Sequence, residues 1–212
     1  MQLDIRWRRE GDRDFPVLVW RLPTPMRSIA SGPHDGGLGV RRWVVNAQVP
    51  PSYARRDPAH HLAKLAVSLG LAGRGNGMLT AADVRRFQSA TDEGVEVITT
   101  VGLGQPILAA ADGDGACRPA GGTVGAGTIN LVAVVPERLT DAALVNAVVT
   151  ATEAKVQALL DAGLRATGTA TDALCILCPS EGSAAEHGGP RSRWGARLAR
   201  AVHTAVLAGA TS

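Results

Sequence analysis

The residues whose types and spacing could do chemistry begin with three threonines and an acid in ATGTATD, residues 166–172. Thr167, Thr169 and Thr171 alternate with Gly and Ala, and the segment ends on Asp172. Side chains this small cannot fill a core, but hydroxyl and carboxyl groups can exchange hydrogen bonds and protons. The pattern suggests the wall of a polar site. The alternative is that the threonines only satisfy backbone groups at a strand end and a helix C-terminus.

A second candidate group lies in TATEAK, residues 150–155, within the longest helical pattern of the chain. At 100° per residue, Lys155 falls in an apolar stripe and Glu153 falls on the opposite, polar face. An unpaired buried ammonium is costly, so Lys155 must reach the helix edge, pair with an acid or serve a site. Glu153 would ordinarily be solvated.

Other short motifs are interpreted as structural. The glycines of residues 121–130 precede a predicted strand, whereas a dinucleotide-binding fingerprint follows a strand and opens a helix. Cys175 and Cys178 form a C-x-x-C within an apolar run and lack a second ligand pair, which indicates buried thiols rather than zinc ligands. His60 and His61 fit a surface or core role on a helix. No complete metal-ligand pattern occurs, and we expect no metal.

The elements that must position these residues alternate between strands and helices. Apolar or alternating runs bounded by Gly and Pro predict strands at residues 2–9, 15–21, 41–49, 94–104, 127–135 and 173–178. Helical periodicity and end signals predict helices at residues 57–70, 80–94, 141–162 and 190–209. This order predicts an α/β (or α+β) fold in which a mixed sheet is layered with helices, as a single domain over residues 1–212. The Gly- and Asp-rich residues 112–127 should be a long loop.

Residues that cap helices support several of these boundaries. Asp57 should cap the first helix, with Pro58 in its first turn. Thr80 with Asp83 resembles a capping box that would open the second helix. Pro190 suits the first turn of the last helix.

Composition limits the class of partner. The formal net charge of +3 comes from 22 basic and 19 acidic residues spread along the chain, and aromatic residues make up 3%, so we expect no nucleic-acid partner. The charged N-terminus lacks an apolar signal region and no run is long enough to cross a membrane. We therefore expect a cytoplasmic protein with no membrane partner, and homo-oligomerisation stays open. Three cysteines in a chain of this size do not form a disulfide framework.

The order of the motifs indicates a family. GTIN at 127–130, TATEAK at 150–155 and ATGTATD at 166–172 are followed by GPRSRWGARLARAV at 189–202. Together they resemble the CbiZ family of adenosylcobinamide amidohydrolases. Upstream segments fall in the order associated with that family, namely RSIAS, GGLG, VVNAQVPPSY, GMLTAADV and VITTVGLG.

This resemblance implies that the chain hydrolyses an amide of a corrinoid. Adenosylcobinamide and water would give adenosylcobyric acid and aminopropanol, a salvage step for cobalamin biosynthesis. The corrinoid would be a substrate rather than a cofactor, and no cofactor is expected. Two other hypotheses stay open: a corrinoid-binding protein without hydrolysis, and an amidohydrolase acting on a non-corrinoid amide.

Amide hydrolysis, the reaction that the resemblance implies, needs an activated nucleophile, donors for the oxyanion and an acid for the leaving amine. Asp172 or Glu153 would activate water, Lys155 or Asn130 would stabilise the oxyanion, and the hydroxyl of Thr128, Thr169 or Thr171 is the alternative nucleophile. Water attack and a covalent route both stay open. The catalytic set is Asp172, Glu153, Lys155 and Thr169, and the substrate-binding set is Asn130, Thr128, Thr171, Gly168, Asn46, Gly37, His187 and Ser192. We expect Asn130, Glu153, Lys155, Thr169 and Asp172 to converge on one pocket, although the helical projection separates Glu153 from Lys155.

Overall fold

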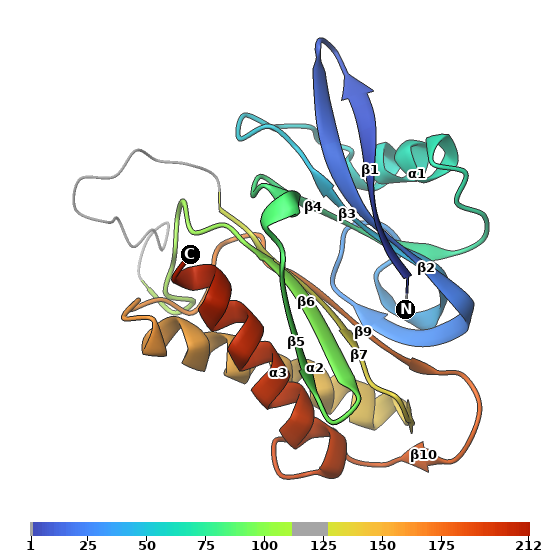
Figure 1. Cartoon of the computed structure of the whole chain (residues 1–212), viewed down its shortest axis with the longest axis vertical. Helices are drawn as coiled ribbons and strands as arrows, with labels where there is room; N and C mark the ends of the chain where they lie inside the picture. Colours follow the sequence, from blue (N-terminus) through green and yellow to red (C-terminus); the bar gives the residue numbers. More distant parts are fainter. Residues whose placement is uncertain (1, 112–126) are drawn as a thin grey trace.

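The computed structural model describes residues 2–111 and 127–212, which form one large mixed sheet with helices packed on it (Figure 1). The predicted α/β class is therefore confirmed. In the 8-stranded sheet the order is β4-β3-β2-β9-β7-β6-β5, and β1 pairs with β2. The strands are β1 (Gln2–Glu10), β2 (Arg13–Ala30), β3 (Gly37–Gln48), β4 (Gly75–Thr80), β5 (Gln88–Asp92), β6 (Val95–Val101), β7 (Ile129–Val134) and β9 (Ala173–Pro179). The helices are α1 (Pro58–Ser68), α2 (Asp141–Asp161) and α3 (Arg193–Ala210), and β8 (Arg138–Leu139) pairs with β10 (Ala184–Ala185) in a separate small sheet.

The long strand β2 connects the two parts of the sheet. Its first half pairs with β1 on one side and β3 on the other. After an irregularity between Arg21 and Met26, its second half pairs with β3 and, on the side that β1 has left, with β9. Neighbours in the 8-stranded sheet are antiparallel except β3 with β4 and β7 with β9, which are parallel. Strand β2 therefore joins β1, β3 and β4 to β9, β7, β6 and β5.

The two parts of the sheet also pack face to face. Asn46 of β3 donates its side-chain amide to Thr100 of β6 at 2.9 Å and accepts from Asn130 of β7 at 2.8 Å, although neither strand neighbours β3 in the sheet. A hydrophobic cluster between the two parts takes residues from both. Its buried members include Leu18, Trp20, Val44 and Met78 from the first part and Val132, Cys175 and Leu177 from the second.

Helices cover the two outer faces (Figure 1). On one, α1 packs Leu62 and Leu65 against Val17 and Val45 of the first part. On the other, α2 and α3 pack on the second part of the sheet. The layers are therefore α1, the first part of the sheet, the second part, and the α2–α3 pair.

Local sequence explains why α2 forms where it does. The Thr140 hydroxyl accepts a hydrogen bond from the amide of Ala143 at 3.1 Å, which satisfies one of the free donors of the first turn. The acid at Asp141 favours the same end of the helix dipole. The helix is followed by Gly163 at φ +80°, a conformation that glycine adopts without steric cost. The predicted span of 141–162 agrees with the structure to within one residue.

The helix predicted at residues 80–94 is wrong. The signals for its start are real, since the Asp83 carboxylate accepts from the amide of Arg85 at 3.0 Å. They cap only one turn of 3-10 helix, Val84–Arg86, after which the chain extends into β5. β5 pairs with β6 along its whole length, and these cross-strand bonds prevail over a weak helical pattern.

The predictions about two other helix starts have mixed outcomes. Asp57 occupies the N-cap of α1 and Pro58 its first turn, as predicted, but the Asp57 carboxylate makes no capping hydrogen bond and accepts instead from the Arg55 guanidinium at 2.9–3.0 Å. The last helix begins at Arg193 rather than at Pro190. Its N-cap is Ser192, whose hydroxyl accepts from the amide of Gly195 at 3.1 Å.

Candidate functional site

The carboxylate of Asp172 is the centre of the candidate site. Its Oδ1 accepts from the Thr169 hydroxyl at 2.5 Å and from the Ile129 amide at 2.9 Å. Its Oδ2 accepts from Lys155 Nζ at 2.5 Å and from the Thr169 amide at 3.2 Å. A carboxylate offers about four lone-pair positions, so all are occupied in this arrangement. Asp172 thereby joins the start of β7, the turn before β9 and helix α2.

Lys155 is the charged partner of this carboxylate. The two side chains are only 15% and 14% exposed, so the ion pair is shielded from solvent on most sides. Of the roles left open for Lys155, the pairing with an acid is confirmed. Removing either partner would leave the other charge poorly compensated.

Gly168 allows the two charged groups to meet. A Cβ at this position would lie 2.2 Å from Asp172 Oδ2 and 2.5 Å from Lys155 Nζ, so no side chain fits. The backbone φ of +155° also favours glycine. The glycine in ATGTATD therefore has a steric explanation that its sequence context alone did not give.

A pocket of about 300 Å³ opens beside the ion pair, and we call it the lysine pocket. It lies on the α2 side of the sheet, and Lys155 and Asp172 are its charged side chains. Its other described lining residues are Ser31, Ile129, Leu131, Val148, Ala151, Thr152, Ala173 and Leu174.

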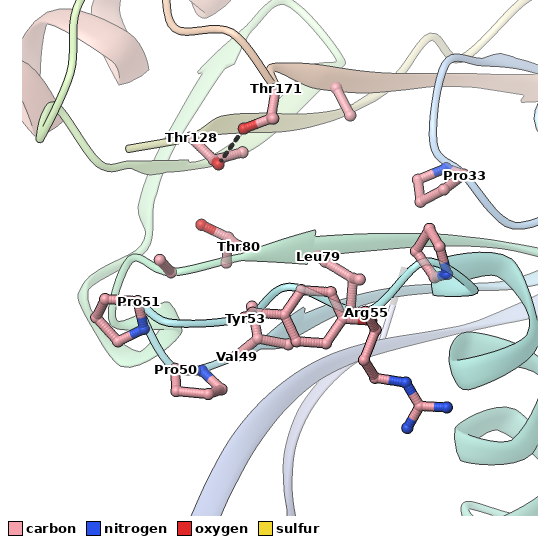
Figure 2. Close-up of a pocket in the computed structure, with 13 residues that line it drawn as sticks. Pro33, Val49, Pro50, Pro51, Tyr53, Arg55, Leu79, Thr80, Thr128 and Thr171 are labelled. Carbon is pink, nitrogen blue, oxygen red and sulfur yellow. Dashed lines mark hydrogen bonds between the residues drawn. The ribbon is translucent and has the colours of Figure 1, made fainter. Parts of the chain in front are cut away.

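A larger pocket of about 400 Å³ lies between the two parts of the sheet, and we call it the threonine pocket (Figure 2). On one wall the hydroxyls of Thr128 and Thr171 are hydrogen bonded to each other at 2.7 Å, and Thr80 at the end of β4 faces them from the opposite wall. The remaining described lining is mostly apolar: Pro33, Val49, Pro50, Pro51, Tyr53, Arg55, Pro58, Leu79, Ala81 and Ala173.

The two pockets meet at the starts of β7 and β9. Thr171, in the turn before β9, lines the threonine pocket, and its neighbour Asp172 lines the lysine pocket. Ala173 lines both. The segment that the sequence indicated as a site wall therefore separates two pockets.

The predicted substrate-binding residues Asn46 and Asn130 line neither pocket. They are 2% and 1% exposed and hydrogen bond to each other, and Asn130 also donates to the carbonyl of Leu79 at 2.8 Å. The Asn130 Oδ1 atom is buried and has no hydrogen-bond partner among the described residues. Through these hydrogen bonds the two asparagines connect β3 and β4 to β7, and they thereby set the distance between the two walls of the threonine pocket.

Several other predicted site residues lie elsewhere, and the expected convergence of five residues on one pocket is wrong. Glu153 is on the exposed face of α2, as the helical projection required. Gly37 is exposed at the start of β3, and His187 is exposed in the segment before α3. Ser192 caps α3. None of these four is among the described residues that line the two pockets.

Some residues that the structure brings to the pockets were not predicted to belong to a site. Tyr53 belongs to VVNAQVPPSY and Thr80 to GMLTAADV, two segments that carried the family resemblance. Ser31 and Pro33, in the connection between β2 and β3, line the lysine pocket and the threonine pocket respectively. The motif order contained the signal, but no pattern of residue types within these segments distinguished the four positions.

The buried thiols and histidine behave as structural groups. Cys175 and Cys178 are free and buried, and burial raises the pKa of the Cys175 thiol to about 12. His61 is 8% exposed and its Nδ1 lies 2.9 Å from the Tyr53 hydroxyl. Cys117 lies outside the described residues. Among those described, no three His, Cys, Asp or Glu side chains are grouped in a way that could hold a metal ion.

No helix in the described part of the chain is both long and apolar enough to cross a membrane.

Comparison with known proteins gives a consistent result. A family model described as adenosylcobinamide amidohydrolase matches residues 4–212. A protein of that name from Methanosarcina mazei is 28% identical over 184 residues, which cover 82% of this chain and 86% of the relative. Another of the same name, from Halobacterium salinarum, is 32% identical over 194 residues, which cover 90% of this chain and 83% of the relative.

Proposed function

The chain belongs to the adenosylcobinamide amidohydrolase family, and from this premise we propose that it hydrolyses the aminopropanol amide of adenosylcobinamide to adenosylcobyric acid. The observation that carries the proposal is the family match over residues 4–212, because pockets of this size accept many kinds of ligand. The geometry supports it by providing a shielded Lys–Asp pair beside a pocket. Such a pair can move a proton and stabilise developing charge, which amide hydrolysis requires.

In the proposed reaction Lys155 moves first. Its Nζ leaves Asp172 Oδ2 and donates to the amide oxygen of the substrate, which frees a lone pair on the carboxylate. Asp172 then takes a proton from a water molecule whose oxygen attacks the amide carbon. The C–N bond breaks, the proton passes from Asp172 to the departing amine, and the products are a carboxylic acid and aminopropanol.

The other donors to Asp172 keep its position during these steps. Thr169 and the Ile129 amide hold Oδ1, and the Thr169 amide holds Oδ2. We propose Thr169 as a residue that orients the carboxylate.

A covalent route through a threonine is the alternative, and it predicts an acyl-enzyme whose mass exceeds that of the free chain.

The corrinoid is proposed as a substrate, with no resident cofactor. A corrin macrocycle with its amide side chains is larger than either pocket, so we propose that it lies across the starts of β7 and β9 and inserts side groups into the pockets.

The cytoplasmic location and the oligomeric state stay predictions that fractionation and light scattering would test.

The test is incubation of the purified chain with adenosylcobinamide, followed by mass spectrometry. We expect adenosylcobyric acid and aminopropanol to appear in equal amounts. Tight binding of the corrinoid without product, in wild type as purified, would instead favour a binding protein. Turnover of simpler amides in preference to the corrinoid would favour an amidohydrolase of different specificity.

A further inference from the structure

The threonine pocket contains little that could do acid–base chemistry. Among its described lining residues, Tyr53 and Arg55 are the side chains that ionise. Burial raises the pKa of Tyr53, and an arginine is permanently charged. The Arg55 guanidinium also points away from the hydroxyl groups (Figure 2). This composition suits a pocket that binds part of the ligand, and the charged pair proposed for water attack lies in the lysine pocket.

Tyr53 gives the threonine pocket an aromatic wall with a fixed orientation. Its ring stacks on His61 with centroids 5.6 Å apart and an interplanar angle of 22°. Its hydroxyl is held by His61 Nδ1 at 2.9 Å. Pro50 and Pro51 precede it, and each has a restricted backbone. A planar group entering the pocket would therefore meet an aromatic surface that is already ordered, which lowers the entropy cost of stacking.

The hydroxyls provide a polar end with unused hydrogen-bonding capacity. Thr80 Oγ1 accepts a hydrogen bond from the Ala82 amide at 3.0 Å. Because Thr80 is the acceptor in this bond, its hydroxyl proton stays available to a ligand. Thr128 and Thr171 share one hydrogen bond at 2.7 Å, which uses one of their two hydroxyl protons. The remaining proton of the pair has a long contact of 3.4 Å to the Gly127 carbonyl when Thr171 is the donor. Neutral groups of this kind suit a ligand with vicinal hydroxyls.

We infer that the threonine pocket holds the nucleoside of an adenosylated corrinoid, with the purine against Tyr53 and the ribose hydroxyls among Thr80, Thr128 and Thr171. This rests on the proposed function for the identity of the whole ligand. The volume of about 400 Å³ is in the range of pockets that enclose small organic ligands. The lysine pocket begins on the other side of Ala173, so one ligand lying over the strand starts can reach both.

The first test uses 5′-deoxyadenosine alone as the probe, titrated calorimetrically into the purified chain. We expect saturable binding that Tyr53→Phe retains and Tyr53→Leu weakens by roughly 5- to 100-fold, the scale of one base stacked on an aromatic ring. Thr171→Val is the second variant, in case Tyr53→Leu fails to fold, and it should also weaken binding. Thr152→Ala, a change in the lysine pocket, is the matched control and should leave nucleoside binding unchanged.

The second test measures turnover of adenosylcobinamide. Tyr53→Leu should raise KM by a similar factor and leave kcat within about twofold, because the nucleoside pocket contributes to binding and not to the chemical step. No binding of 5′-deoxyadenosine by wild type, or equal binding by wild type and Tyr53→Leu, overturns the inference. Absence of hydrolysis overturns the proposed function alone, since the titration does not depend on turnover.

Discussion

At the scale of single residues, the candidate site is held together by the hydrogen bonds of one carboxylate, that of Asp172. Asp172 receives four hydrogen bonds: two from Thr169 in its own turn, one from Lys155 of α2 and one from Ile129 of β7. Substituting a residue with so many partners can change both the stability of the fold and the rate of the reaction. Measuring these two effects separately decides whether Asp172 is catalytic.

We predict that Asp172→Asn lowers turnover by about 100-fold or more, the scale of a general base, because an amide cannot take a proton from water. Corrinoid affinity should fall by only about 1–2 kcal/mol, the scale of an ordinary hydrogen bond. Single-turnover rates and dissociation constants for wild type and variant measure the two effects. Gln157→Ala, at an exposed position of α2 that is outside the described lining of both pockets, should behave as wild type.

Stability must be separated from chemistry in that experiment. The new amide group would face Lys155 Nζ and the Thr169 amide, which are both donors, so thermal melts of Asp172→Asn should show a loss of stability. The double variant Asp172→Asn, Lys155→Met also removes the lysine charge that Asp172→Asn leaves without a partner. It should therefore recover part of the lost stability. If the double variant is stable and still turns over within a few-fold of wild type, Asp172 is structural.

A second prediction concerns Gly168. Gly168→Ala places a methyl group within 2.2 Å of Asp172 Oδ2, so the ion pair must separate. We expect a destabilisation of about 1–3 kcal/mol, the usual cost of overpacking, together with a large loss of turnover. The control is Gly163→Ala, since Gly163 has φ +80° but nothing within 4 Å of where its Cβ would lie. It should cost about 1 kcal/mol in denaturant melts and leave turnover unchanged. Equal turnover losses in both variants would contradict the steric explanation.

At the scale of elements, sequence patterns predicted strands and helices well where one signal dominated. The long helix α2 has a cap, an acid in its first turn and a terminal glycine, and its predicted span agrees with the structure. Residues 80–94 had a cap signal too, yet only one turn follows it because β5 pairs with β6. Pairing partners lie outside the local window, so capping chemistry alone could not show where the helical turn ends.

The same reasoning explains which candidate site residues the sequence could indicate. Asp172, Lys155, Thr169 and Gly168 lie together in the structure, and all four belong to TATEAK or ATGTATD, the two segments in which the sequence placed its candidate catalytic groups. Tyr53 lies 118 positions before Thr171 in the chain, and the two line one pocket only because the sheet folds over. That long-range proximity could not be predicted from residue types.

Helix α1 leads to a prediction about pH. Burial lowers the pKa of His61, and Glu10 opposes the shift only in part. Because its pKa is lower in the folded than in the unfolded chain, where it is near 6.5, protonation favours unfolding. The stabilising contribution is therefore present above pH 6.5 and is lost as the pH falls through the lower folded value. Denaturant melts between pH 8 and pH 5 should show the free energy of unfolding falling on the acid side.

A matched pair of variants assigns that pH dependence. His61→Gln should flatten it, whereas His60→Gln, at the exposed neighbouring position, should leave it as in wild type. An unchanged profile in His61→Gln would mean that another group titrates in this range.

At the scale of the whole molecule, the two pockets exist because the sheet folds over on itself. The threonine pocket has one wall from β4 and the other from the starts of β7 and β9 (Figure 2). The bonds of Asn46 to Asn130 and Thr100 hold these walls at a fixed separation. Binding of one ligand by both walls therefore requires that the two parts of the sheet behave as one unit.

The last prediction is that the two parts unfold together. Strand β2 pairs in both, and the cluster between them buries Trp20 and Met78 of one part against Val132 and Leu177 of the other. Losing either part would expose this apolar face, and each fully buried large side chain contributes roughly 1.5–3 kcal/mol to stability. Hydrogen exchange of peptides from β3 and β7, measured across a denaturant series, should lose protection at the same concentration. Protection that survives in β7 after it is lost in β3 would show two separate cooperative units, and the prediction of a single domain over residues 1–212 would then be wrong.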